Sequence, residues 1–164
     1  MNKPVFVKTR AGLYRVRGQV SEEEILQAGA AILLEGLSNG EAFTRNQDAE
    51  QFLQLALAHE RNEHFAVLFL DSQNRLLRFE RLFSGSINQT EVHPRVIAQR
   101  ALQLNAGAVI LAHNHPSGHP EPSKADQMVT QQIRQALNLF DIQLLDHIIV
   151  TRNRCTSLAE RGLL

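Results

Sequence analysis

The feature that most restricts the fold of this chain is a pair of histidines directly after a continuously apolar segment. Residues 108–112 are apolar throughout, and His113 and His115 follow them. Because side chains alternate across an extended strand, two histidines one residue apart point to the same side. A proline and a glycine then bend the chain, so that Ser123 and Asp126 can approach the histidines from another direction. The sequence therefore predicts a buried strand that ends in a cluster of polar side chains.

Two imidazoles and a carboxylate form a ligand set that zinc favours, and three protein ligands leave one coordination position open. Each residue has a simpler explanation on its own: a single histidine is usually only hydrogen bonded, and Ser-x-x-Asp before an apolar stripe is an ordinary helix cap. The combination of His113, His115 and Asp126 favours metal binding. A capped aspartate in the first helical turn is also held firmly, as a ligand must be. We therefore predict a zinc hydrolase with Zn²⁺ as its cofactor.

The length of 164 residues and a hydrophobic content of 43% are typical of one globular domain. Because 17 basic and 17 acidic residues give a net charge of zero, direct nucleic-acid binding is not expected. The basic residues Lys8, Arg10, Arg15 and Arg17 are interpreted as a solvated strand edge. The lone Cys155 excludes an intrachain disulfide, and we expect a small, half-buried side chain there. Without a membrane-spanning stretch or a signal sequence, the chain is expected to be cytoplasmic.

The N-terminal part is expected to form helices. A capping box at residues 21–24 opens a helix that ends near Gly36, and a second helix runs from about residue 47 to residue 59. Residues 1–45 have too little apolar mass for a core of their own. We interpret them as an N-terminal extension packed on the core, with the metal-binding domain at residues 46–164.

The rest of the chain alternates between strands and helices, which predicts an α/β fold with a mixed sheet and helices packed against it. His113 and His115 fall at the C-terminal end of a strand, where α/β sheets tend to carry their sites. The predicted strands are 65–70, 76–83, 108–112 and 142–150, and the predicted helices are 95–104 and one from Ser123 with Met128, Val129, Ile133, Leu137 and Phe140 on its inner face.

The spacing of His113, His115, Ser123 and Asp126 resembles the JAMM signature of the MPN metalloprotease superfamily. Four longer segments make the chain similar to the bacterial RadC family over about residues 42–164. The resemblance implies the cytidine-deaminase-like α/β sandwich of MPN domains, with His113, His115 and Asp126 as zinc ligands, water in the fourth position and Ser123 steadying an oxyanion. The segments are 91–95, 112–118, 121–126 and 145–150.

The resemblance also implies a glutamate that acts first as general base and then as general acid toward the leaving amine. Glu63 matches best, because it directly opens the first strand of the catalytic unit. Its simpler explanation is a solvated corner between a helix and a strand. Glu60, Glu80 and Glu91 are the other candidates.

Two positions depart from the pattern, and two of the other histidines, His93 and His147, could also be taken for metal ligands. Asn114 stands where eukaryotic-type members have Ser or Thr, and it should face away from the metal. His119 replaces an acidic or small residue, so it is either a solvated loop residue or an additional ligand. His93 and His147 are expected to support the fold or the ligands. The consecutive letters His-Asn-His do not fit an HNH nuclease, which spreads these residues over a ββα unit.

Three functions remain open at this stage. The first is a peptidase or isopeptidase that cleaves an amide bond of an unknown peptide or protein substrate. The second is a non-catalytic accessory protein of DNA repair or mobile-element biology that binds DNA or a protein partner. The neutral charge, and the lack of a recognisable helix-hairpin-helix region, disfavour DNA as a direct ligand. The third is a metal-binding scaffold whose site is filled by its own loop.

Overall fold

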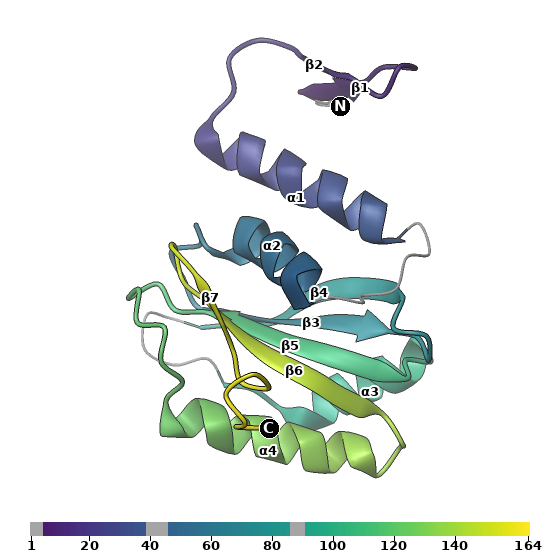
Figure 1. The fold of residues 1–164 in the computed structure, drawn as a ribbon, viewed down its shortest axis with the longest axis vertical. Helices are drawn as coiled ribbons and strands as arrows, with labels where there is room; N and C mark the ends of the chain where they lie inside the picture. Colours follow the sequence, from purple (N-terminus) through teal and green to yellow (C-terminus); the bar gives the residue numbers. More distant parts are fainter. Residues whose placement is uncertain (1–4, 39–45, 86–90) are drawn as a thin grey trace.

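The computed structural model of the chain describes residues 5–38, 46–85 and 91–164. A five-stranded sheet lies between two helical layers, with α2 on one face and α3 and α4 on the other (Figure 1). The elements in order are β1 (Phe6–Lys8), β2 (Tyr14–Val16), α1 (Glu22–Ser38), α2 (Asn46–Leu57), β3 (His64–Leu70), β4 (Leu76–Ser84), α3 (Pro94–Gln103), β5 (Ala108–Asn114), α4 (Lys124–Asn138), β6 (Gln143–Val150) and β7 (Cys155–Ser157).

The strand order in the sheet is β4-β3-β5-β6-β7, so β5 lies at its centre. The pair β5 and β6 is parallel and is connected through α4, whereas the other neighbouring strands are antiparallel. This mixed sheet with helices on both faces confirms the predicted fold class. In the register, His113 stands opposite Phe65 of β3 and opposite Ile149 of β6. The predicted metal ligand therefore sits between two fully paired strands.

Alternate side chains of the central strands enter two separate apolar layers. On β5, Ala108, Ile110 and Ala112 pack with α2, whereas Val109 and Leu111 pack with α3 and α4. The central strand is thus buried on both faces, as its continuously apolar sequence predicts. Because the alternation continues past the apolar run, it turns His113 toward the face that α4 covers. This is what brings the histidine to the start of α4.

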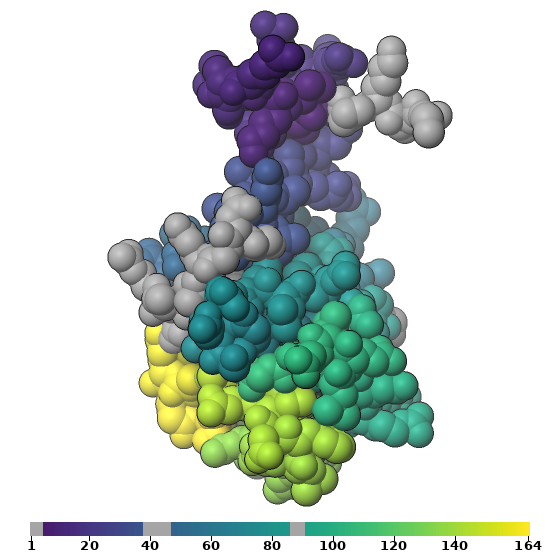
Figure 2. All heavy atoms as spheres, turned by 90° about the vertical axis from the view of Figure 1, so that its right-hand side faces the viewer, coloured from purple at the N-terminus to yellow at the C-terminus, as the bar shows by residue number. Residues whose placement is uncertain are grey.

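The N-terminal hairpin of β1 and β2 projects with α1 from one end of the molecule (Figures 1 and 2). The helix α1 packs on α2, and Leu33, Leu34 and Leu37 contact the apolar layer beneath it. These contacts explain why the helix continues past Gly36, where the sequence predicted its end. The division of the chain near residue 45 stays a prediction, since residues 39–45 lie outside the described part.

Other boundaries also differ from the sequence prediction. The helix α2 ends at Leu57 instead of residue 59, and β5 continues through Asn114 because it still pairs with β6 there. Met128 on α4 is exposed, and Phe140, also predicted to lie on the inner face, is exposed beyond the end of the helix at Asn138. The first buried residue of α4 is Thr130. Among the described residues, no helix has both the length and the apolar character needed to cross a membrane.

Candidate metal centre

The predicted ligands meet where β5 ends and α4 begins. His113 is the penultimate residue of β5, His115 follows the strand, and Asp126 lies in the first turn of α4. The two Nε2 atoms are 2.8 Å apart; Asp126 Oδ1 is 3.2 Å from Nε2 of His113, and Oδ2 is 3.6 Å from Nε2 of His115. His113 is fully buried, whereas His115 and Asp126 are partly exposed. The cluster is therefore open to solvent on one side only.

A buried chain of hydrogen bonds orients His113 from behind. Its Nδ1 is 2.8 Å from Nε2 of His147, whose Nδ1 is 2.6 Å from the Thr130 hydroxyl. The Thr130 hydroxyl donates its proton to the backbone oxygen of Asp126 at 2.5 Å. Burial lowers the pKa of His147 well below its usual value, so this imidazole is neutral. The chain thus connects one candidate ligand to the backbone of another.

These partners fix which ring nitrogens carry protons. Since Thr130 has already donated its proton, it accepts from Nδ1 of His147, and the unprotonated Nε2 of His147 accepts from Nδ1 of His113. His115 donates from Nδ1 to the backbone oxygen of His119 at 2.7 Å. In the neutral imidazoles, both Nε2 lone pairs therefore face each other and the Asp126 carboxylate. Such a group of acceptors repels itself unless a cation or a proton lies between them.

The carboxylate of Asp126 is held by the cap of its own helix. Its Oδ2 accepts from the Ser123 nitrogen at 2.7 Å and from the Ser123 hydroxyl at 2.6 Å, and the Asp126 nitrogen donates to the same hydroxyl. Burial alone would raise the pKa of this carboxyl, but its interactions with His113 and His115, together with the hydrogen bond from Ser123, hold it far below its usual range. The second oxygen, Oδ1, is left facing the histidines.

The geometry fits zinc. Zinc bonds of about 2.0 Å in tetrahedral geometry place neighbouring ligand atoms about 3.3 Å apart. The 2.8 Å between the two Nε2 atoms and the 3.2 Å from Nε2 of His113 to Oδ1 of Asp126 lie close to that value, and one ligand atom from each of the three residues falls within 4.8 Å of the others. Both imidazole orientations are also fixed by a hydrogen bond at the other nitrogen, which is the usual support of zinc-binding histidines. The residues present could therefore hold a metal ion without rearrangement of the fold.

The two residues predicted to be catalytic lie beside this cluster. Ser123 is the N-cap of α4, and its hydroxyl contacts the Asp126 carboxylate, so the cap expected as its simpler role is present. Glu63 precedes β3 and is partly buried. The pKa of His115 is raised chiefly by Asp126 and, to a smaller extent, by the charge of Glu63. Their catalytic roles stay predictions.

The alternative glutamates are engaged elsewhere. Glu60 forms an ion pair with Arg81 at 2.5 Å, and Glu80 binds Arg100 through both oxygens. Glu91 is exposed and lies 3.8 Å from the His93 ring. Of the four candidates, Glu63 is therefore the one whose position favours a role at the metal centre.

Asn114 faces away from the cluster, as the alternation predicts. Its buried side chain accepts from the backbone nitrogen of His64 at 2.8 Å and donates to the backbone oxygen of Asn62 at 3.0 Å. These two residues flank Glu63 in the sequence. The residue between the two histidines therefore fastens the segment that carries the candidate base.

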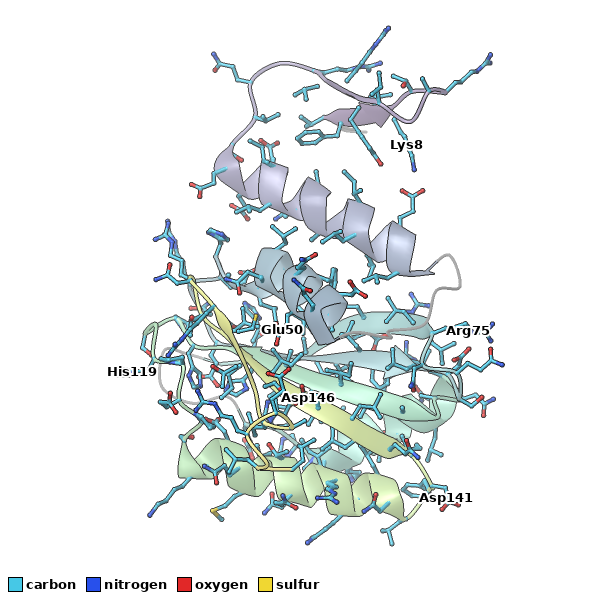
Figure 3. The ribbon with its side chains drawn as sticks, viewed as in Figure 1. Lys8, Glu50, Arg75, His119, Asp141 and Asp146 are labelled. Atoms are coloured by element: carbon cyan, nitrogen blue, oxygen red, sulfur yellow. The ribbon has the colours of Figure 1, made fainter. Side chains whose placement is uncertain are left out.

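The remaining polar residues have supporting roles. The His119 side chain is exposed on the outer loop (Figure 3), where only its backbone oxygen contacts His115. Cys155 is half-buried, as expected, and its thiol donates a hydrogen bond to the side-chain oxygen of Gln54. The sequence analysis did not single out Thr130. The available signal was a polar residue four positions after Asp126, on the otherwise apolar inner face of the helix.

A mixed sheet between helical layers, with a His-His-Asp cluster at the junction of β5 and α4, defines a JAB-type, or MPN-type, domain. Residues 43–163 match the family model described as RadC-like JAB domain. The chain belongs to the RadC family.

Three relatives that share much of this sequence are all named UPF0758 proteins. A UPF0758 protein of Vibrio cholerae is 45% identical over 151 residues, covering 92% of this chain and 95% of the relative. Another from Methylibium petroleiphilum is 51% identical over 140 residues, covering 85% of this chain but 63% of the relative. A third from Leptothrix cholodnii is 46% identical over 159 residues, covering 94% and 72%. The chain thus spans less than two thirds of the Methylibium relative.

Proposed function

We propose that this protein is a zinc-dependent metallohydrolase that cleaves an amide bond as a peptidase or isopeptidase. The observation that carries the proposal is the convergence of two imidazole lone pairs and a carboxylate at the solvent-facing end of β5. His113, His115 and Asp126 are the proposed ligands. Three protein ligands leave a position for water, which is the arrangement of catalytic rather than structural zinc.

Zinc, when bound, would lower the pKa of a coordinated water to about 7 and polarise the substrate carbonyl. We assign Glu63 to take the proton from the attacking water and to return it to the leaving amine. Ser123 would donate its hydroxyl proton to the oxyanion of the tetrahedral intermediate, which requires that hydroxyl to leave Asp126. His147 and Thr130 keep His113 in the required orientation.

Elemental analysis of the purified protein tests the metal site. Wild type is expected to contain one zinc ion per chain, and His113→Ala and Asp126→Ala are expected to lose it. His119→Ala is the matched control, because this side chain lies in the same loop but is exposed. Full zinc content in both ligand variants would refute the site.

Cleavage of a peptide and isopeptide library tests catalysis separately. Glu63→Gln is expected to keep zinc and to lose hydrolysis, because an amide cannot accept the proton. Unchanged hydrolysis in this variant would show that Glu63 is not the base. Zinc binding without any cleavage by wild type would favour the non-catalytic alternatives, an accessory protein or a metal-binding scaffold.

A further inference from the structure

A groove of about 850 Å³ opens between α1 and the body of the molecule. Its walls come from three elements: Leu26, Ala30 and Leu34 belong to α1, Phe52 and Leu55 belong to α2, and Phe79 belongs to β4. Phe52 and Phe79 contact each other edge to face, which gives the groove a rigid aromatic side. The groove can therefore receive apolar side chains.

The groove is continuous with the metal centre. His115 and Pro116 also line it, and the Nε2 atom of His115 is one of the proposed metal-binding atoms. The backbone nitrogen of His115 is fixed by the oxygen of Val150 at 2.8 Å, so this wall is held by the sheet. A chain lying in the groove would pass beside the reacting centre.

The charges at the groove indicate what kind of chain fits. Arg61 and Arg152 line it and are exposed, and neither forms an ion pair with any residue in the described part of the chain. Glu22 and Glu23, in the first turn of α1, also line the groove, so it offers charges of both signs. By contrast, Arg81 in the same groove is neutralised by Glu60. Arg61 lies two residues before Glu63 and Arg152 two residues after Val150, so both belong to segments that meet at the metal centre.

We propose that this groove binds an extended peptide segment of the substrate, with an apolar side chain against Leu26 and Leu55 and an acidic side chain near Arg61 and Arg152. The assignment deepens the proposed function and rests on it, since the segment is positioned for cleavage. An apolar floor bordered by charged groups suits a peptide better than a lipid, because unpaired guanidinium groups are costly to cover with hydrocarbon. Most of one wall is α1, which lies outside the residues matched by the RadC-like JAB domain. The N-terminal helix would thus determine which peptides bind.

Selection from a phage-displayed library of short random peptides tests the groove on the full chain, both zinc-loaded and metal-free. An enriched, fluorescein-labelled peptide is then titrated by fluorescence anisotropy. Leu26→Glu is expected to weaken binding by about tenfold or more, because it places a charge on the apolar wall. Ile25→Glu is the matched control, since Ile25 is exposed on the same helix and does not line the groove. It should bind as wild type does.

Ala31→Trp provides a second variant that avoids any folding defect, because Ala31 is exposed and still lines the groove. The added ring should displace the peptide to a similar extent. Arg152→Glu should shift the selected sequences from acidic to basic. His113→Ala should lose zinc and cleavage but keep peptide binding. Binding without cleavage by the zinc-loaded wild type would sustain the groove and refute the hydrolase. Failure to enrich any peptide would overturn the proposal. So would binding by Leu26→Glu and Ala31→Trp that is as tight as binding by wild type.

Discussion

The side-chain oxygen of Asn114 accepts a hydrogen bond from the backbone nitrogen of His64 at a distance of 2.8 Å. With the bond from the same amide to the Asn62 oxygen, it fixes both neighbours of Glu63. Asn114 stands between the two candidate metal ligands in sequence, but its side-chain hydrogen bonds go to the backbone of residues 60–64. At the end of β5, the side chains on one face are the candidate ligands, and the side chain on the other face fixes the segment of the candidate base.

Asn114→Ala is expected to separate metal binding from catalysis. The variant should keep its zinc, because His113 and His115 retain their own partners, while hydrolysis falls as Glu63 loses its fixed position. The free energy of unfolding should decrease by about 1–3 kcal/mol, since partly buried backbone groups of Asn62 and His64 lose their partners. Zinc analysis, library cleavage and urea unfolding measure the three quantities. Loss of zinc comparable to His113→Ala would contradict this role.

Removing the hydrogen bonds behind His113 should weaken metal binding. His147→Ala and Thr130→Val are each expected to lower zinc affinity by about 10–100-fold, because partners of ligating histidines contribute on that scale. Competition with a chromophoric chelator gives the affinity. Ile133→Val is the control, since Ile133 is equally buried one turn further along α4 and loses only packing. An affinity as low in the control as in Thr130→Val would show a general loss of stability instead.

Cys155 is expected to resist alkylation in the folded protein. Burial, together with the nearby charge of Glu50, raises the pKa of this thiol to about 12, so the reactive thiolate is scarce at neutral and mildly alkaline pH. Treatment with iodoacetamide near pH 8 followed by mass spectrometry should show almost no modification until denaturant is added. Rapid labelling of the native protein would contradict the buried position beside Gln54.

We predict that duplex DNA is not retained at physiological salt. The exposed residues Arg10, Arg15 and Arg17 lie on or beside the β1–β2 hairpin, but the chain as a whole has a net charge of zero. Anisotropy of a labelled duplex should show, at most, weak binding at low salt that disappears as salt is added. Retention at physiological salt with a steep salt dependence, lost on replacing these arginines by alanine, would instead support the accessory role in DNA repair.

The centre of the fold could be predicted because its sequence signals are local and agree with one another. Residues 108–112 are apolar without interruption, and the capping box of Ser123 and Asp126 marks the start of α4; the structure contains both features. The same two signals bring His113 and Asp126 into contact. The local pattern and the long-range packing agree here, so the sequence alone predicts both elements and the contact between them.

Other elements depend on distant partners and left little local trace. The strands β1, β2 and β7 have three residues each and exist through their pairing, β7 against β6 for example. The continuation of α1 past Gly36 depends on contacts with the apolar layer beneath it. The relation of His147 to His113 depends on the parallel register of β5 and β6. No single segment of the sequence contains that information.

The parallel pairing of β5 with β6 has a consequence for how this protein matures. If β5 paired with β6 one residue out of register, every side chain of β5 would turn to the opposite face. The amide of Asn114 would then take the place of the His113 imidazole. Such a chain could still bury hydrocarbon on both sides of the sheet. It would, however, place Asn114 toward Asp126 and direct His113 away from it. Metal uptake would then discriminate correctly assembled molecules from near-native ones that differ by a single step along one strand.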